Sequence, residues 1–388
     1  METTRYLIVG GGMTADAACK GIREHDADGR IVLVGAEPYA PYKRPPLSKK
    51  LWFGDDESTV WRGTEELGVE LRLGRRIERI DPAGHTAVDD EGTEYHWEKL
   101  LLATGGQPRR LGGDDADVVY FRTLDDYRQL RAAAGNGTRA IVVGGGFIGS
   151  EIAAALTTAG SSVTMLFPEP SINWRVLPPD LSEYVSDTYR EHGVEVLAGE
   201  TVAAVTSGGV RTGSGAELEA EMVVAGLGIV PATELAEAAG LPVENGIVVD
   251  DRGRVVGHED VFAAGDVAQF PIVALGRSGR VEHEDHANSH GRTVGANMAG
   301  ADEPYDHLPF FYSDMFDLGY EAVGDLDSRL PVVAAWQEPH RKGVVAFVDE
   351  ESRPRGFLLW DVWGKVDAAT ELIRAGRPVD EDAVAALA

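Results

Sequence analysis

The chain has very little cysteine, and it has no long apolar run. Cys19 is its only cysteine among 388 residues, so it can form no internal disulfide, no redox-active cysteine pair and no four-cysteine metal site. No apolar run approaches the roughly 18 residues that a membrane-spanning helix needs. Because residues 1–6 lead directly into a strand-like run, we also expect no secretory signal and no transit peptide.

Positive charge is scarce as well. Lys and Arg number 36 against 64 for Asp and Glu, which gives a formal net charge of −28. A nucleic-acid-binding protein normally has a basic face, and anionic membranes attract basic segments, so neither is an expected partner. At about 150 residues per domain the length indicates two or three domains. We therefore expect an acidic, cytoplasmic, multidomain protein.

Glycine, in contrast, is abundant, with 47 residues. It first gathers in a strand–turn–helix–strand pattern near the start of the chain. In order, the pattern consists of a strand over 6–9, the turn residues Gly10, Gly12 and Ala15, a helix over 15–23, and a strand over 31–34 that ends near Glu37.

The same pattern returns 134 residues later. Its parts are a strand over 140–143, the turn residues Gly144, Gly146 and Gly149, a helix over 150–159, and a strand over 162–167 that ends near Glu169. Either turn alone is compatible with an ordinary tight turn of an α/β fold. Two complete copies predict two dinucleotide sites.

The chemistry of a dinucleotide explains these residue types. The first glycine permits the tight turn, the second lets the backbone approach a pyrophosphate, and the third small residue lets helix and strand pack closely. The pyrophosphate then lies at the N-terminal end of the helix. Glu37 and Glu169 follow Ala15 and Gly149 at about the spacing of 20 residues that is typical of a ribose-binding acid.

Further strands predict the fold class. Apolar runs at 100–102, 222–225 and 261–263 are followed by small residues. Shorter strands with one helix follow after about residue 309; those late elements lie at 331–336, 343–348, 356–362 and 367–375. We predict an α/β protein with two Rossmann-like dinucleotide-binding domains and a small α+β C-terminal domain.

Over nearly its whole length the chain resembles the FAD-dependent pyridine nucleotide oxidoreductases of the ferredoxin-reductase and apoptosis-inducing-factor type. Besides the two glycine turns, the resemblance rests on the stretches at 41–49, 103–105, 146–151, 167–169, 264–266, 281–287, 312–314 and 319–324. The stretches at 167–169 and 281–287 are closer to bacterial relatives of apoptosis-inducing factor. The long C-terminal insertion of the animal factor is absent, and Tyr312 stands where the family commonly has Trp.

The resemblance implies a domain layout. A split FAD-binding domain would comprise 1–112 and 245–306, an inserted NAD(H)-binding domain 113–244, and a C-terminal interface domain 307–388. The C-terminal domain would close over the flavin and form the face for a partner or for a homodimer.

The resemblance also implies which residues bind FAD. Gly10, Gly12 and Ala15 would hold the pyrophosphate, Glu37 the adenosine ribose and Asp266 the ribitol, while Lys49 would stabilise the reduced ring, which becomes anionic. The remaining residues of this predicted site are Arg44, Ala103, Thr104, Gly105, Glu282, His283 and Tyr312.

A second group would bind NAD(H) and carry the reaction. Glu169 would accept the ribose 2′-OH and favour NADH over NADPH, although the nearby Arg175 would soften that preference. The predicted NAD residues are Gly144, Gly146, Phe147, Gly149, Glu151, Glu169 and Gly228, and the predicted catalytic residues are Lys49, Glu151, Phe147 and His283. Lys49 would pair with Glu151, and Phe147 would cover the flavin ring.

Several residues have simpler alternatives. Lys43, Arg44, Lys49 and Lys50 would also suit a solvated basic loop, although three of the chain's seven lysines lie there. His283, His286 and His290 have the spacing of one helical face, but we expect no metal. We expect His286 and His290 to be solvent-exposed or capping residues, and Cys19 to be a small core residue.

Two functions remain open. The first is a reductase that transfers hydride from NADH to flavin and passes electrons to a redox protein of the ferredoxin or rubredoxin type, or to a quinone. The second is a slow flavoprotein of the apoptosis-inducing-factor type that forms a charge-transfer complex, dimerises and acts as a redox sensor.

The segment at 41–50 has no cysteine, which argues against a disulfide reductase. A charge of −28 would repel a small acidic ferredoxin, and the candidate basic patches are few: Arg75-Arg76, Arg109-Arg110 and Arg341-Lys342.

Overall fold

The computed structural model describes residues 2–113, 115 and 117–388. The chain forms two compact units, and each is built from several separate segments. The first unit comprises the described residues of 1–43, 58–107 and 230–309, and the second comprises those of 44–57, 108–229 and 310–388. The three-domain division predicted above is a different subdivision of the chain, and it stays a prediction.

A mixed sheet forms the centre of the first unit. Strands β3, β2, β1 and β6 run parallel, β18 pairs in parallel with β6, and β5 and β4 continue the sheet antiparallel. Their bounds are β1 Glu2–Val9, β2 Ile31–Gly35, β3 Glu70–Leu73, β4 Ile77–Asp81, β5 Thr86–Asp89, β6 Glu94–Leu102 and β18 Val261–Ala263. Val9 is paired with Val34 on one side and Leu102 on the other, so three strands end at one edge.

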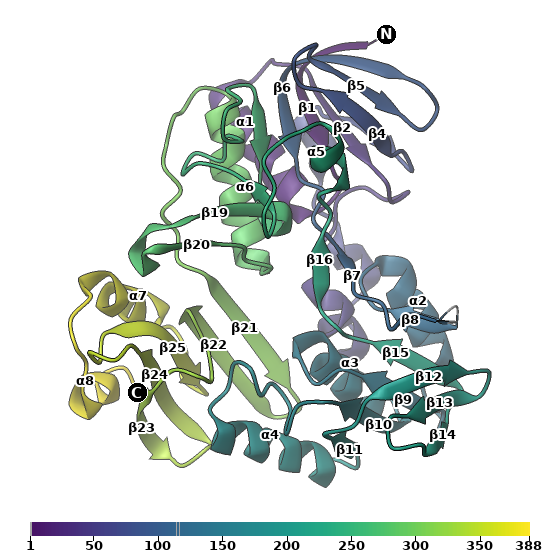
Figure 1. Cartoon of the computed structure of the whole chain (residues 1–388), viewed down its shortest axis with the longest axis vertical. Helices are drawn as coiled ribbons and strands as arrows, with labels where there is room; N and C mark the ends of the chain where they lie inside the picture. The colour runs from purple at the N-terminus through teal and green to yellow at the C-terminus, as the bar shows by residue number, and fades with distance from the viewer. Residues whose placement is uncertain (1, 114, 116) are drawn as a thin grey trace. The chain divides into compact units, whose positions relative to one another are not determined.

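Two helices, α1 (Met13–His25) and α6 (Glu284–Met298), lie side by side in this unit (Figure 1). Their apolar side chains share one core with β1, β2, β6 and β18. Glycine permits their close approach, because a Cβ atom on Gly295 would lie 2.1 Å from the carbonyl oxygen of Ala18, and one on Gly21 would lie 2.0 Å from that of Arg292. The core includes the fully buried Cys19, as predicted.

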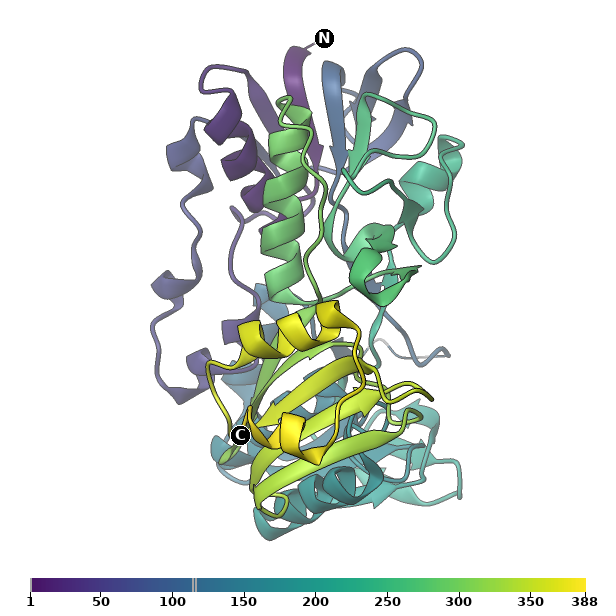
Figure 2. The ribbon, with the colours of Figure 1, turned by 90° about the vertical axis from the view of Figure 1, so that its left-hand side faces the viewer.

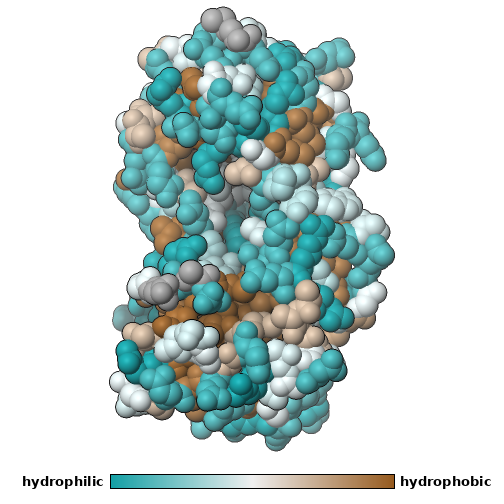
Figure 3. Space-filling model, turned by 90° about the vertical axis from the view of Figure 1, so that its right-hand side faces the viewer, coloured by the Kyte–Doolittle hydropathy of each residue, from teal (hydrophilic) through white to brown (hydrophobic). Residues whose placement is uncertain are grey.

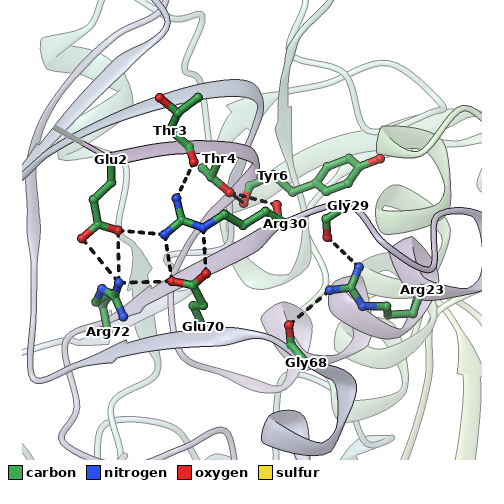
Figure 4. Close-up of polar contacts among 10 residues, drawn as sticks. All are labelled: Glu2, Thr3, Thr4, Tyr6, Arg23, Gly29, Arg30, Gly68, Glu70 and Arg72. Atoms are coloured by element: carbon green, nitrogen blue, oxygen red, sulfur yellow. Dashed lines mark hydrogen bonds and ion pairs between the residues drawn. The ribbon is translucent and has the colours of Figure 1, made fainter.

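An ion-pair network joins the strands of this sheet at their N-terminal ends (Figure 4). Arg30 donates to both carboxylate oxygens of Glu70, at 2.7 and 2.8 Å, and also contacts Glu2 at 3.2 Å. Arg72 bridges the same two carboxylates. The hydrogen bonds from Arg30 hold the pKa of Glu70 below its usual value, so charge as well as apolar packing ties β1 to β3.

Smaller elements complete the first unit. A three-stranded sheet has the order β17-β19-β20, and the short helix α5 contacts β4. Their bounds are α5 Glu234–Ala238, β17 Ile247–Val248, β19 Ala268–Ile272 and β20 Arg277–Gly279. Apart from the elements of this unit, β7 Gly106–Pro108 and β16 Ile229–Pro231 pair as a two-stranded sheet.

The second unit contains a parallel sheet in the order β11-β10-β9-β15-β8 and an antiparallel three-stranded sheet, β12-β13-β14. The strands are β8 Val118–Tyr120, β9 Arg139–Val143, β10 Ser162–Phe167, β11 Glu195–Ala198, β12 Val202–Thr206, β13 Gly209–Thr212, β14 Glu217–Glu219 and β15 Met222–Ala225. The helices are α2 Leu124–Ala133, α3 Phe147–Thr158 and α4 Pro179–Glu191.

The C-terminal part of this unit is an antiparallel five-stranded sheet, in the order β21-β22-β25-β24-β23, with two helices on one face (Figure 2). The bounds are β21 Phe310–Met315, β22 Leu318–Gly324, β23 Val332–Glu338, β24 Lys342–Val348, β25 Pro354–Trp360, α7 Val366–Ala375 and α8 Glu381–Ala385. The three late strands and the late helix predicted from the sequence are confirmed, as are both strand–turn–helix–strand patterns.

The segment 44–57 belongs to the second unit although its neighbours in sequence belong to the first. Trp52 packs edge-on against Tyr127 of α2 with ring centroids 5.7 Å apart, and the Tyr127 hydroxyl donates to the Leu51 carbonyl at 3.2 Å. Arg44 donates to the carbonyl of Arg122 at 2.7 Å. This anchoring fixes the position of Ser48 and Lys49 within the second unit.

Candidate functional site

The first glycine turn crosses the end of a neighbouring strand. Gly10 follows β1 with a φ of +130°, and a Cβ atom there would lie 2.1 Å from the carbonyl oxygen of Ala103, directly after β6. Gly12 precedes α1, no side chain caps the helix, and a Cβ atom on Gly12 would meet no protein atom within 4 Å. The helix N-terminus therefore presents backbone N–H groups to open space, which fits a pyrophosphate.

The second turn repeats this construction in the other unit. Gly144 has a φ of +119°, and its Cβ would lie 2.4 Å from the carbonyl oxygen of Gly226, directly after β15. Gly146 precedes α3, again without a side-chain cap and with no protein atom within 4 Å of a Cβ atom. The residues at both turns fit a dinucleotide pyrophosphate.

The predicted ribose-binding acids already have partners. Glu37, after β2, accepts a hydrogen bond from the Tyr42 hydroxyl at 2.5 Å. Arg175 donates through Nε and Nη2 to Oε1 of Glu169, at 3.0 and 2.7 Å. The second pair places a cation against the acid that the sequence assigns to NADH selection.

Two further segments of the first unit meet at the edge of the first turn. The backbone N–H of Ala103 donates to the Val9 carbonyl, and the Thr104 hydroxyl donates to the Ala232 carbonyl at 2.7 Å. Asp266 lies in the short helix Gly265–Val267, and a Cβ atom on Gly265 would lie 2.2 Å from the hydroxyl of Thr14. Gly10, Ala103 and Asp266 thus lie on neighbouring segments of one unit.

The three histidines of α6 and its N-terminus are not equivalent. His283 precedes the helix, and burial lowers its pKa to about 4. The expectation that His286 and His290 are exposed or capping residues is wrong, because both are fully buried. His290 accepts a hydrogen bond at Nδ1 from the Gly265 backbone N–H at 3.3 Å, and burial lowers its pKa to about 3.

Aromatic side chains surround these two buried histidines. His286 stacks on Phe270 with ring centroids 4.8 Å apart, and its Nδ1 lies 3.0 Å from the Tyr305 hydroxyl. No three His, Cys, Asp or Glu side chains are grouped to hold a metal ion in the part of the chain that the structure describes. His286 and His290 pack against the rings of Phe270 and Tyr305.

A buried ionic cluster lies in the second unit. Nζ of Lys49 is 3.3 Å from Oε1 of Glu151, and both side chains are largely buried. Ser48 donates to Oε2 of Glu151 at 2.6 Å, and Ser313 donates to Oε1 at 2.8 Å. The Lys49 ammonium lies over the Tyr312 ring, 4.2 Å from the ring centroid. The predicted pair of Lys49 and Glu151 forms, and the alternative of a solvated loop is wrong for Lys49.

The sequence patterns missed the two serines of this cluster. Ser48 adjoins Lys49, and Ser313 adjoins Tyr312, but Glu151 lies far from both in the sequence. No motif announces a contact between such separate segments. The one sequence signal that could have found them is that each adjoins a predicted site residue.

The remaining predicted residues are placed as follows. Phe147 begins α3 and packs edge-on against Phe311 of β21, with ring centroids 5.1 Å apart. Gly228 has a φ of +79° and accepts a hydrogen bond from the Arg109 backbone N–H. Glu282 pairs with Arg280 at 2.6 Å. Lys49, Phe147, Glu151 and Tyr312 thus share the second unit, whereas Glu37, Asp266 and His283 belong to the first.

Comparison with known proteins agrees with this construction. Residues 4–291 match the family described as pyridine nucleotide-disulphide oxidoreductase. The chain belongs to this family. Residues 294–341 match the C-terminal region of apoptosis-inducing factor, mitochondrion-associated. The match to the oxidoreductase family confirms the resemblance predicted from the sequence. Reductases of this family use FAD and NAD(H).

Two curated relatives of this oxidoreductase span nearly the whole chain. One is the ferredoxin–NAD(+) reductase component of the anthranilate 1,2-dioxygenase system of Burkholderia cepacia, 35% identical over 99% of this chain and 98% of its own. The other is apoptosis-inducing factor 1 of Dictyostelium discoideum, 30% identical over 98% of this chain and 80% of its own. The relatives thus include both a ferredoxin reductase and an apoptosis-inducing factor, the two types that the sequence resembles.

Solved structures confirm the predicted fold class. The chain is similar to putidaredoxin reductase in its covalent complex with putidaredoxin, with a TM-score of 0.90 and 27% identity over 99% of this chain and 96% of that one. It is also similar to the ferredoxin reductase for the CYP199A2 system of Rhodopseudomonas palustris, with a TM-score of 0.90 and 30% identity over 99% and 97%. The protein is an FAD-dependent pyridine nucleotide oxidoreductase.

None of the helices in the described residues is both long enough and apolar enough to span a membrane. The surface visible in Figure 3 is mostly hydrophilic, with apolar side chains in separate patches. The candidate basic patches are partly neutralised, because Arg75 pairs with Asp89 and Asp90 and Arg110 lies 3.5 Å from Asp115.

Proposed function

We propose that this oxidoreductase transfers hydride from NADH to FAD and passes the electrons to a redox protein of the ferredoxin or rubredoxin type. The repeated glycine turn carries this proposal, because each unit presents an uncapped helix N-terminus to open space beside the end of a crossing strand. The named activities of the relative from Burkholderia cepacia and of putidaredoxin reductase support the acceptor class. A quinone is the other acceptor class.

FAD would bind to the first unit. The N-terminus of α1 would hold its pyrophosphate, with Glu37 at the ribose and Asp266 at the ribitol. When bound, FAD supplies the redox chemistry, because its ring accepts a hydride and releases two electrons. His283 would contact the ring as a neutral imidazole at neutral pH, since burial lowers its pKa to about 4.

NADH would bind to the second unit. The N-terminus of α3 would hold its pyrophosphate, and Glu169 would accept its ribose hydroxyl. A carboxylate repels a 2′-phosphate, whereas Arg175 would attract one. Because Arg175 is bonded to Glu169, we propose that the acid dominates and that NADH is preferred over NADPH.

Residues of the second unit would assist the reaction. Lys49 would be the cation that stabilises a reduced, anionic ring, held in place by Glu151. Phe147 would cover the ring and exclude water. Gly228 and Tyr312 would line the same site, whereas Arg44, which bonds to a backbone carbonyl, would support the segment that carries Lys49.

We also propose the domain layout, the location and the assembly expected from the sequence. FAD-binding, NAD-binding and interface domains would comprise 1–112 with 245–306, 113–244 and 307–388. A chain with a single cysteine suits the reducing cytoplasm, and the C-terminal domain would provide the face for a homodimer or a partner.

One observation favours the second function. The match to the C-terminal region of apoptosis-inducing factor covers 294–341, which includes Tyr312 and Ser313. A protein of that type would react slowly, form a lasting charge-transfer complex with the nicotinamide, dimerise and act as a redox sensor.

Reoxidation of the reduced protein separates the two functions. The purified protein is reduced anaerobically with one equivalent of NADH and then mixed with a ferredoxin, a rubredoxin or a soluble quinone. The reductase function predicts that one of these acceptors restores the flavin absorbance within seconds. A long-wavelength band that persists with every acceptor, together with dimerisation, would favour the sensor and contradict the reductase.

A further inference from the structure

The Glu151 carboxylate has a separate hydroxyl donor on each of its oxygens. Ser48 donates to Oε2 at 2.6 Å, and Ser313 donates to Oε1 at 2.8 Å. The Lys49 ammonium lies on the Oε1 side, at 3.3 Å. A carboxylate held at both oxygens cannot rotate about its terminal torsion without losing a charge-assisted hydrogen bond.

Two pairs of adjacent residues, Ser48-Lys49 and Tyr312-Ser313, also determine where the Lys49 ammonium lies. Lys49 follows Ser48 in the segment 44–57, and its Nζ donates to the backbone carbonyl of Tyr312, the residue before Ser313, at 3.3 Å. The Tyr312 ring lies 4.2 Å from Nζ. Two dipeptides, Ser48-Lys49 and Tyr312-Ser313, thus clamp the carboxylate of α3 from two other elements.

Burial makes these hydroxyl bonds consequential. Ser313 is 1% exposed, Ser48 5% and Glu151 7%, so water has little access to replace a missing donor. A buried charged acceptor that loses a donor pays the full cost of desolvation. Loss of either hydroxyl would therefore free the carboxylate to turn, and the ion pair that holds the Lys49 ammonium would loosen.

We propose that Ser48 and Ser313 are positioning residues for the reaction. They fix the Glu151 carboxylate, and through it they fix the Lys49 ammonium at the point where the flavin ring is to be reduced. This inference rests on the proposed function, which places Lys49 beside the flavin. A misplacement of about 1 Å in such a group can cost about a hundredfold in rate.

The main test compares Ser313→Ala and Ser48→Ala with the wild type, all loaded with FAD. Ser186→Ala is the matched control, because Ser186 is equally buried in the same unit but bonds only to backbone groups near α4. We expect the maximal rate of flavin bleaching by NADH to fall about tenfold in each test variant, with the dissociation constant of NADH unchanged, as for an interaction specific to the transition state.

The conservative variant and a double mutant separate positioning from folding. Ser313→Thr keeps the hydroxyl and should restore most of the rate that Ser313→Ala loses. In a Glu151→Gln background, Ser313→Ala should cost little further, because both changes disrupt one unit. If the losses in rate from Ser313→Ala and Glu151→Gln were fully additive in the double mutant, the proposal would be overturned. A wild-type rate in both alanine variants would overturn it as well.

A second readout needs no catalysis. Acetylation of lysines in the FAD-loaded protein, followed by peptide mass spectrometry, reports the accessibility of each amine. Ser313→Ala and Ser48→Ala should raise the modification rate of Lys49 severalfold, while the exposed Lys43 and Lys50 serve as internal controls. Unchanged labelling of Lys49 in both variants would refute the positioning role. A wild-type flavin that NADH fails to bleach would instead refute the proposed function and leave the labelling result to decide the positioning.

Discussion

The carbonyl oxygen of Gly144 lies 2.0 Å from the position that a Cβ atom on Gly149 would occupy. A side chain at Gly149 would therefore displace the turn itself. Three residues earlier the situation is reversed, because a Cβ atom on Gly146 would meet no protein atom within 4 Å. Close packing requires glycine at Gly149, whereas only a ligand would require it at Gly146.

Gly146→Ala should therefore fold normally and impair NADH alone. The added methyl would project toward the space proposed for the pyrophosphate, and we expect the dissociation constant of NADH to rise at least about tenfold, or ~1.4 kcal/mol. FAD content and the thermal unfolding midpoint should match the wild type. Gly208→Ala, at an exposed glycine that is also free of close neighbours, should leave NADH binding unchanged. Normal NADH affinity in Gly146→Ala would argue against a pyrophosphate at α3.

The buried His290 should make the protein sensitive to mild acid. Its pKa is about 3 in the folded state against 6.5 ordinarily, so between these values the unfolded chain binds a proton that the folded chain does not. The free energy of unfolding should fall as the pH decreases from 6.5 toward 3, by up to about 1.4 kcal/mol per pH unit for this histidine.

Urea unfolding of His290→Gln at pH 7, 6 and 5 tests this expectation. The glutamine oxygen can still accept from Gly265, and the variant should show a slope smaller by up to about 1.4 kcal/mol per pH unit. An unchanged slope in His290→Gln would mean that His290 titrates normally in the folded protein.

The ion-pair network of Glu70 should contribute at neutral pH and disappear in acid. Hydrogen bonds from Arg30 hold the pKa of Glu70 below its usual 4.5, so its contribution is complete above that pH and is lost as the pH falls through the lower folded value. Glu70→Gln should therefore flatten the acid limb of the stability profile. Because the network is partly exposed, we expect a loss of about 1 kcal/mol or less at pH 7, and less in high salt.

Chemical denaturation at low and high salt provides the measurement for this network. Arg329→Met serves as a control, since Arg329 pairs with Asp327 only within an exposed turn. A loss for Glu70→Gln that is no larger than for Arg329→Met, or that persists undiminished in 1 M salt, would contradict the account.

Glu169 should set the preference between coenzymes. Glu169→Gln removes the charge that repels a 2′-phosphate and releases Arg175 to attract one, so the ratio of kcat/KM for NADH over NADPH should fall about tenfold or more. Arg175→Met should raise the same ratio. Steady-state kinetics with both coenzymes provides the measurement, and equal ratios in all three proteins would exclude a role for the pair.

Ionic strength should affect acidic and basic acceptors in opposite directions. With a net charge of −28, and with Arg75, Arg110 and Arg341 each beside carboxylates, the protein should repel an acidic ferredoxin at long range. Raising the salt from about 10 to 150 mM shortens the Debye length from about 30 to 8 Å and should speed that reaction while slowing one with a basic haem protein. Faster reduction of the acidic ferredoxin at low salt would indicate a local basic docking face.

The sequence predicted the two dinucleotide units well because their information is local. Apolar runs of four to six residues, glycines at fixed spacing and a following helix specify each unit without reference to the rest of the chain. The closeness of Ala103 to Gly10 and of Gly226 to Gly144 also follows, since small residues end the strands that cross the turns.

The features that the sequence patterns did not predict depend on contacts between segments far apart in the chain. Glu151 is held by Ser48 and Ser313, which lie 103 and 162 residues away. His286 and His290 are buried against Phe270 and Tyr305. Histidines at helical spacing form no apolar pattern, so the sequence did not indicate that this face of the helix is buried. The anchoring of Trp52 on Tyr127 likewise joins two elements that no local pattern relates.

The central claim is that two dinucleotide sites pass a hydride from NADH to FAD, and an anaerobic titration tests it most directly. The purified protein should contain one FAD, and one equivalent of NADH should bleach its absorbance near 450 nm, with Gly146→Ala requiring far more NADH. A colourless protein that takes up no FAD, or a yellow protein that NADH leaves unchanged, would contradict the account.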